Sequence, residues 1–304
     1  MGIDLHCLRL LQYAASKAPF GDVATLGRQN IHVKDSTLQK TLQLPPAKRY
    51  GPFCEDLLIE QFGATSVTSF DASDYEHATI VHDMNKPLDH DRQYDTVIDL
   101  GTLEHIFDLA VALKNIAMLC KPNGRIIHSL PANNYNGHGF WQFSPELFFS
   151  LYATSNGFAD TEVYIAELDD EQNWWKAAVP ANGVRVEYTS ASRSYVLALT
   201  RKQAAKTGQT VQQSDYVVNW EQGHVTVPVE PRSMRAIIHS VLSNAPLMWR
   251  LADVIVPVPN SHSDAGMHRL SASNRHYTKV PVDALLLTSS RPASRHANGN
   301  RVSG

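Results

Sequence analysis

The sequence predicts a doubly wound α/β fold, in which helices cover both faces of a mostly parallel sheet. Short apolar segments rich in β-branched residues alternate with segments whose apolar side chains recur at helical spacing. The clearest strand is 94–101 (YDTVIDLG), which ends at a glycine and is followed by a helical pattern over 107–120. A glycine, Gly27, also directly follows the first predicted strand, 22–26. In a doubly wound sheet, this first turn from strand to helix faces the ligand.

The region 91–158 carries the most ordered signals. Within the predicted helix 107–120, one apolar stripe faces the core, with Asp108 at the positive start of the helix and Lys121 at its negative end. Residues 122–124 (PNG) predict its stop, and 125–130 (RIIHSL) is a second buried strand. The sequence Ser-Pro-Glu at 144–146 predicts the start of another helix, which ends near Gly157.

The flanking segments supply the remaining elements. A helix is expected over 5–18, and an insertion over 31–61 contains a helix at 53–62 and is either a lid, a substrate wall or plain packing. Further strands are expected at 66–70, 78–82, 161–168 and 194–201. We interpret Trp174 and Trp175, between the last two strands, as cover for the sheet rather than as a pocket lining.

Composition excludes several classes of protein. The chain has 304 residues and a formal net charge of -3, which argues against an electrostatic nucleic-acid binder. No apolar run is long enough to span a membrane, and a signal peptide is not expected. Three widely spaced cysteines predict buried, reduced thiols in a cytoplasmic protein. No cysteine or histidine pair has metal-ligand spacing, so no metal site is expected.

An ordered set of motifs resembles a known family. Tyr94-Asp95 opens the central strand, Leu103-Glu104-His105 follows it, and Lys121-Pro122-Asn123-Gly124 precedes the next strand, which Pro131 closes. This pattern, over residues 20–201, resembles the class I S-adenosylmethionine-dependent methyltransferases. The resemblance implies a seven-stranded Rossmann-like sheet with an antiparallel last strand, S-adenosyl-L-methionine as cofactor, and methylation of a small-molecule acceptor such as a sugar or secondary metabolite.

The resemblance also implies cofactor contacts at successive strand ends. Asp71 follows the second strand, where an acid accepts hydrogen bonds from ribose hydroxyls; a turn or capping acid is the alternative. Asp83 suits the adenine amino group and Met84 the adenine ring, unless Asp83 only forms an Asx turn. The complete expected set of cofactor-binding residues is Gly27, Asp71, Ala72, Asp83, Met84, Gly101, Leu103 and Glu104.

The loop 132–143 leaves the carboxyl end of a strand and mixes amides, aromatics and a histidine, as substrate-facing loops do. His138 in this loop, or His105, could act as a general base, since an unperturbed histidine titrates near neutral pH. Fourteen histidines are scattered along the chain, so a structural role for either is the alternative. Alignment of a reactive acceptor could also make a base unnecessary.

We expect a methyltransferase domain over 1–201, a C-terminal extension over 202–288 that could form a homodimer contact, and a disordered tail over 289–304. Strand-like fragments are expected at 217–229 and helical patches at 235–256. The family usually has several glycines after the first strand, whereas this chain has only Gly27 there. A methyltransferase-like partner subunit without cofactor turnover is therefore the alternative function. An NAD-linked oxidoreductase is disfavoured because the Gly-x-Gly-x-x-Gly pattern is absent.

Overall fold

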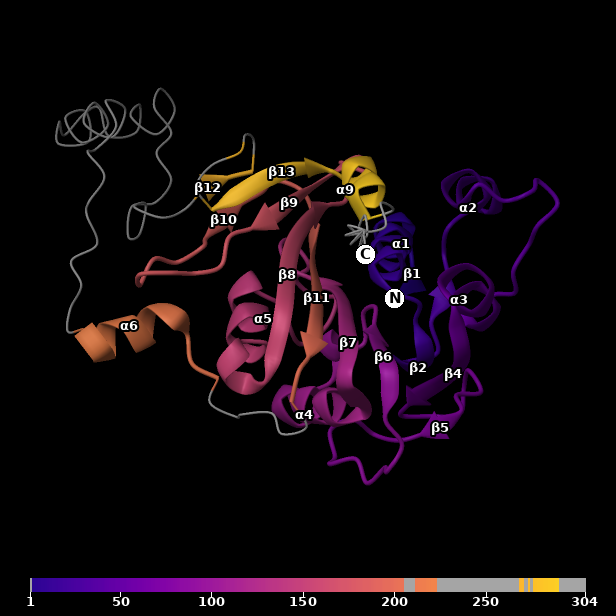
Figure 1. Ribbon diagram of the computed structural model, residues 1–304, viewed down its shortest axis with the longest axis horizontal. Coiled ribbons are helices and arrows are strands. Elements are labelled where there is room, and N and C mark those ends of the chain that lie inside the picture. The colour runs from indigo at the N-terminus through magenta and orange to yellow at the C-terminus, as the bar shows by residue number, and fades with distance from the viewer. Residues whose placement is uncertain (1, 205–210, 223–267, 271–272, 274–275, 290–304) are drawn as a thin grey trace, which may run out of the picture.

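The computed structural model describes residues 2–204, 211–222, 268–270, 273 and 276–289, and is drawn in Figure 1. Its strands are β1 (Gly2–Ile3), β2 (Gly21–Leu26), β3 (Asn30–Ile31), β4 (Ala64–Asp71), β5 (Ile80–Val81), β6 (Tyr94–Asp99), β7 (Cys120–Pro131), β8 (Phe158–Glu167), β9 (Asn173–Ala177), β10 (Tyr188–Thr189), β11 (Ser194–Lys202), β12 (His268–Arg269) and β13 (Tyr277–Pro281). Its helices are α1 (Leu5–Lys17), α2 (Asp35–Leu42), α3 (Glu55–Phe62), α4 (Leu109–Leu119), α5 (Pro145–Leu151), α6 (Ser214–Gln222) and α9 (Val282–Ser289), with short 3-10 turns η1 (Leu103–His105) and η2 (Thr154–Asn156).

One nine-stranded sheet organises these elements, in the order β13-β9-β8-β11-β7-β6-β2-β4-β5. Strands β5, β4, β2, β6 and β7 are parallel, whereas β11 runs antiparallel to both β7 and β8. The expected seven-stranded, mostly parallel sheet with an antiparallel last strand is therefore present from β5 to β8. Two strands, β9 and β13, extend it beyond the expected count.

The register of the parallel strands places their carboxyl ends in one row. Leu26 of β2 pairs with Phe70 of β4 on one side and with Asp99 of β6 on the other. Asp99 in turn pairs with His128 of β7. The turns that follow β2, β4 and β6 therefore begin at the same edge of the sheet, which is where ligands bind in open α/β sheets.

Helices pack on both faces of the sheet (Figure 1). One core joins α4 and α5 to the sheet, and the other joins α1, α3 and α9 to it. Trp174 and Trp175 are adjacent in β9, and because side chains alternate along a strand they enter the two cores separately. Both are almost fully buried, but they belong to a strand of the sheet instead of covering it from the connecting segment.

Local signals account for several helix ends. Asp4 caps α1 by accepting from Cys7 N, Asp108 caps α4 by accepting from Val111 N, and Ser144 caps α5 by accepting from Glu146 N. Gly63 ends α3 in the left-handed conformation. Strand β7 starts earlier than expected, because its ladder with β6 already begins at the pair Tyr94–Cys120 and continues, with an irregularity, past the predicted stop.

The C-terminal extension departs from expectation where it is described. Residues 214–222 form the helix α6, so the strand-like fragments expected from 217 are wrong over that part. The helical patches expected at 235–256 and the tail from 290 lie outside the described residues. All three cysteines are buried and free, as expected. No helix in the described part of the chain has the length and apolar character needed to cross a membrane.

Candidate active site

Gly27 lies where three turns meet at the carboxyl edge of the sheet. Its φ of 71° is in the left-handed region that glycine adopts at little cost. Its N–H donates to the carbonyl of Phe70 at 2.7 Å, which ties the turn after β2 to the end of β4. A Cβ at this position would lie 3.0 Å from Thr102 Oγ1 and 3.9 Å from Asp71 Oδ2. The absence of a side chain therefore allows the turns that follow β2 and β6 to approach each other closely.

The turn after β6 is held by two side chains that the sequence did not single out. Asp99 Oδ1 accepts from the Thr102 N–H at 3.0 Å, and Thr102 Oγ1 donates to the carbonyl of Leu26 at 2.8 Å. Gly101 between them has a φ of 93°. The sequence did carry a signal for these two residues, namely an acid at the end of a strand followed by a glycine and a hydroxyl residue. These bonds fix the start of η1 and so the position of Glu104.

Asp71 ends β4 and Asp83 follows the adjacent strand β5, at the same edge of the sheet. Asp71 pairs in register with Val81, and the His82 N–H donates to the Asp71 carbonyl at 2.7 Å. The half-buried Asp71 accepts from the Ser73 N–H through Oδ1 at 3.3 Å, while Ala72 is exposed. The row of strand ends expected from the sequence is thus continuous from Gly27 to Asp83.

Not all expected cofactor residues present their side chains to this edge. Asp83 Oδ1 accepts from the backbone and side-chain nitrogens of Asn85 at 3.0 and 2.8 Å, and these bonds lower the pKa of Asp83. This is the Asx turn that the sequence offered as the alternative. Met84 and Leu103 are buried in the core, with the Met84 sulfur 3.6 Å from Asn115 Nδ2. A ligand at the edge would meet these two residues mainly through their backbone.

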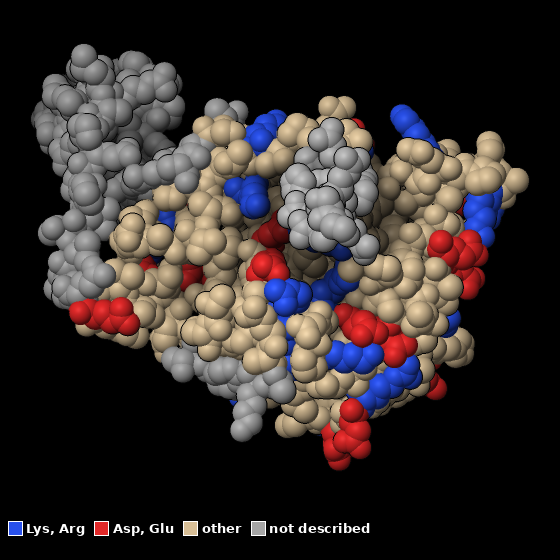
Figure 2. All heavy atoms as spheres, in the orientation of Figure 1, with Lys and Arg blue, Asp and Glu red and all other residues tan. Residues whose placement is uncertain are grey.

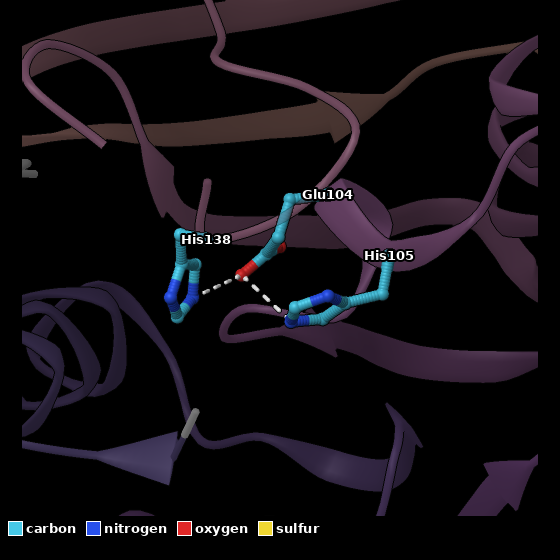
Figure 3. Close-up of side chains that lie close together, drawn as sticks. All are labelled: Glu104, His105 and His138. Atoms are coloured by element: carbon cyan, nitrogen blue, oxygen red, sulfur yellow. Dashed lines mark ion pairs between the residues drawn. The ribbon is translucent and has the colours of Figure 1, made fainter. Parts of the chain in front are cut away.

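Glu104, His105 and His138 form a compact polar cluster beside this edge (Figure 3). Glu104 Oε1 lies 3.7 Å from His105 Nε2 and 3.6 Å from His138 Nε2. The Glu104 side chain is 0% exposed, whereas those of His105 and His138 are 47% and 35% exposed. The carboxylate therefore lies at the bottom of the cluster, with the two imidazoles on its solvent side. The sequence named all three residues but did not predict that they meet.

The charge state of the cluster follows from burial. Desolvation, with a further contribution from the negative charge of Asp99, raises the pKa of Glu104 to about 8. Burial lowers the pKa of His138, and burial together with the neighbouring His138 lowers that of His105. Both imidazoles are therefore neutral near pH 7 and have a lone pair available to a proton or a metal ion.

The loop after β7 brings His138 to Glu104. The Phe140 N–H donates to the Glu104 carbonyl at 2.7 Å, and Trp141 Nε1 donates to the Ile106 carbonyl at 2.9 Å. Gly139 permits this approach, because a Cβ there would lie 2.6 Å from the Glu104 carbonyl oxygen. The expectation that this loop faces a ligand is consistent with its position over η1.

A buried hydrogen-bonded row supports the site from below. His128 Nδ1 lies 3.0 Å from Asp99 Oδ2, and its Nε2 lies 2.7 Å from the Tyr152 hydroxyl. Asp99 and His128 are 0% exposed. Since Asp99 also accepts from Thr102, this row connects α5 and β7 to the turn that carries Glu104.

Comparison with known proteins finds a family match over part of the chain. Residues 49–195 match the family model of a methyltransferase domain. No match was found among curated proteins. Similar solved structures include the N-methyltransferase NodS of Bradyrhizobium japonicum (12% identity, 65% of this chain and 94% of that chain, TM-score 0.37) and YcgJ of Bacillus subtilis (12%, 66% and 100%, TM-score 0.40). A third is the 1,6-didemethyltoxoflavin-N1-methyltransferase of Burkholderia thailandensis (16%, 66% and 78%, TM-score 0.36). At these identities and scores, the likenesses do not bear on the substrate.

Proposed function

We propose that the chain methylates an oxygen or nitrogen atom of a small-molecule acceptor. Two findings support this proposal: residues 49–195 match a methyltransferase domain, and the motifs of the chain resemble the class I S-adenosylmethionine-dependent methyltransferases. The observation that carries the proposal is the position of the cluster of Glu104, His105 and His138. It lies beside the edge formed by Gly27, Asp71 and Gly101, where the cofactor is expected. One edge of the sheet would thus hold the methyl donor, and the cluster next to it would receive the acceptor.

The residues at the edge fit the cofactor chemically. The turn at Gly27, which has no side chain, would let the cofactor approach the backbone, and the Asp71 carboxylate would accept from its ribose hydroxyls. The backbone of Gly101 and Leu103 and the turn at Asp83 would line the remaining part of this site. When bound, S-adenosyl-L-methionine supplies an electrophilic methyl group on its sulfonium centre.

The cluster is suited to handling the acceptor's proton. Both imidazoles are neutral near pH 7 and partly exposed, so either can accept a proton from a hydroxyl or an ammonium group placed beside it. The buried Glu104 lies within 3.7 Å of both rings, so its carboxyl group adjoins the nitrogen that would receive the proton. Positioning contributes as well, since alignment of the acceptor lowers the entropy lost in the transition state.

The surface charge favours a small acceptor over a polyanion. On the face drawn in Figure 2, acidic and basic side chains of the described residues are interspersed, without a broad field of one sign. The formal net charge of -3 agrees with this. Nucleic-acid binding depends on clustered basic residues.

Calorimetric titration of the full chain with S-adenosylhomocysteine tests the cofactor site directly. We expect one site per chain in the wild type, and weaker binding in Asp71→Asn with an unchanged thermal melting curve. Incubation with radiolabelled cofactor and a library of hydroxyl- and amine-bearing metabolites then tests transfer. Absence of binding at about 1 mM ligand would contradict the proposal and would favour a partner subunit without cofactor turnover.

Two further proposals concern the setting of the enzyme. We propose a cytoplasmic location because the three cysteines are buried and free.

We propose a homodimer contact through the C-terminal extension because α6 exposes Tyr216 and Trp220, two large aromatic side chains, at 46% and 66%. Light scattering of the wild type and of a Tyr216→Ser, Trp220→Ser variant would test the dimer; equal masses for the two would contradict this contact.

A further inference from the structure

Glu104 is a buried acid without a hydrogen-bonding partner. Neither Oε1 nor Oε2 has such a partner within the described part of the chain, although the side chain is 0% exposed. The Nε2 atoms of His105 and His138 lie 3.7 and 3.6 Å from Oε1, and both are beyond hydrogen-bond distance. Buried carboxylates are almost always paired, hydrogen-bonded or bound to a metal ion. The structure thus places a carboxyl oxygen without a hydrogen-bonding partner, and free to bind a metal ion, at the centre of the cluster.

The three side chains together offer a ligand set typical of divalent transition metals. One oxygen and two nitrogen atoms, one from each residue, lie within 4.8 Å of one another. Ligands bonded to a cation at about 2.1 Å lie about 3.0–3.4 Å apart in octahedral or tetrahedral geometry. The Glu104–His105 and Glu104–His138 separations of 3.7 and 3.6 Å are already close to this. The two partly exposed imidazoles can move the remaining distance, while the buried carboxylate stays fixed.

We propose that Glu104, His105 and His138 form a binding site for a divalent first-row transition metal ion such as Zn²⁺, Mn²⁺, Fe²⁺ or Co²⁺. Two imidazoles and one carboxylate suit these ions better than Mg²⁺ or Ca²⁺, which prefer oxygen ligands alone. The two imidazoles lie on the exposed side, so the remaining coordination positions face outward. Three protein ligands with open positions are the arrangement of catalytic rather than structural metal sites.

The surrounding backbone holds this ligand set together. Glu104 and His105 are adjacent in η1, whose start is fixed by Asp99 and Thr102. His138 comes from the loop after β7, which is hydrogen-bonded to the Glu104 carbonyl through Phe140. Two segments distant in sequence are therefore attached to each other at the proposed site.

The open positions narrow the class of acceptor. An acceptor with an oxygen or nitrogen donor next to the atom that is methylated could occupy them and be oriented toward the cofactor edge. This part of the inference rests on the proposed function, whereas binding of the metal ion does not.

Titration of the chelator-treated full chain with Co²⁺, followed by its visible absorption and by mass spectrometric metal analysis after dialysis, tests the site. We expect one Co²⁺ per chain in the wild type. The dissociation constant should rise at least tenfold in Glu104→Gln and in His138→Ala. His77→Asn, which removes an exposed histidine with a φ of 55° and supplies a residue that tolerates this conformation, is the matched control and should bind like the wild type.

The outcomes separate this site from the proposed methyl transfer. Failure of the wild type to bind Co²⁺ at about 1 mM, or equal affinity in the wild type, Glu104→Gln and His138→Ala, would overturn the metal site. S-adenosylhomocysteine binding by the same metal-free samples would then leave the proposed function standing. Co²⁺ binding without any binding of S-adenosylhomocysteine would leave the metal site standing and contradict the proposed function. Should Glu104→Gln fail to fold, His138→Ala, which alters only a loop side chain, still decides the question.

Discussion

Substituting Glu104 by glutamine should change how the stability of the metal-free protein depends on pH. In the folded protein the pKa of Glu104 is raised to about 8 from its ordinary value of 4.5, so folding takes up a proton between these two pH values. Stability therefore falls as pH rises through this window and does not recover above it. One pKa unit corresponds to about 1.4 kcal/mol, so the wild type should lose on the order of 2–3 kcal/mol between pH 6 and pH 8 from this group alone.

Urea unfolding at pH 6, 7 and 8 in the presence of a chelator measures this effect. The lowered pKa values of His105 and His138 add a slope of the opposite sign below about pH 7, because these histidines are protonated more readily in the unfolded chain. Since the wild type and the variant share this slope, the comparison is the difference between their two curves. Glu104→Gln should lack the loss of 2–3 kcal/mol, since an amide does not titrate. Glu60→Gln, at an exposed acid whose pKa is lowered, is the control and should parallel the wild type. Parallel curves for Glu104→Gln and the wild type would refute the argument that Glu104 is a buried acid.

Three further substitutions test the edge of the sheet and its support. Gly27→Ala should lower the free energy of unfolding by about 1–2 kcal/mol, because a side chain is strained at φ 71° and its Cβ would lie 3.0 Å from Thr102 Oγ1. Gly51→Ala, whose Cβ would meet no atom within 4 Å, is the control, and urea unfolding measures both variants. Asp71→Asn should weaken S-adenosylhomocysteine binding about tenfold or more through loss of charge-assisted bonds, and unchanged affinity by calorimetry would remove Asp71 from the ribose site. His128→Leu should cost about 3–5 kcal/mol because it leaves Asp99 buried without its partner, and a loss below 1 kcal/mol in urea unfolding would contradict that pairing.

The central elements were predictable because their signals are local. The apolar run of β6, the capping Asp108 of α4 and the Ser144-Pro145 start of α5 each lie within a few residues of the structure they determine. Strands β9 and β13 were not predicted, since each is short and depends on its partner: Trp175 pairs with Lys279, far along the chain. The helix α6 was missed because its β-branched residues resemble a strand pattern when packing is unknown.

By itself, the sequence determined the class of fold, the resemblance to methyltransferases and the row of turns at which a cofactor is expected, because strand ends and turn glycines are recognised from neighbouring residues. It also named Glu104, His105 and His138 as separate residues of interest. Only the tertiary structure decided that these three meet, because His138 reaches Glu104 through a loop whose approach depends on Gly139 and on a backbone bond to the Glu104 carbonyl. It likewise decided that Met84 and Leu103 lie in the core. Burial and proximity between distant segments arise from packing, and here packing brings one acid and two histidines together in one site.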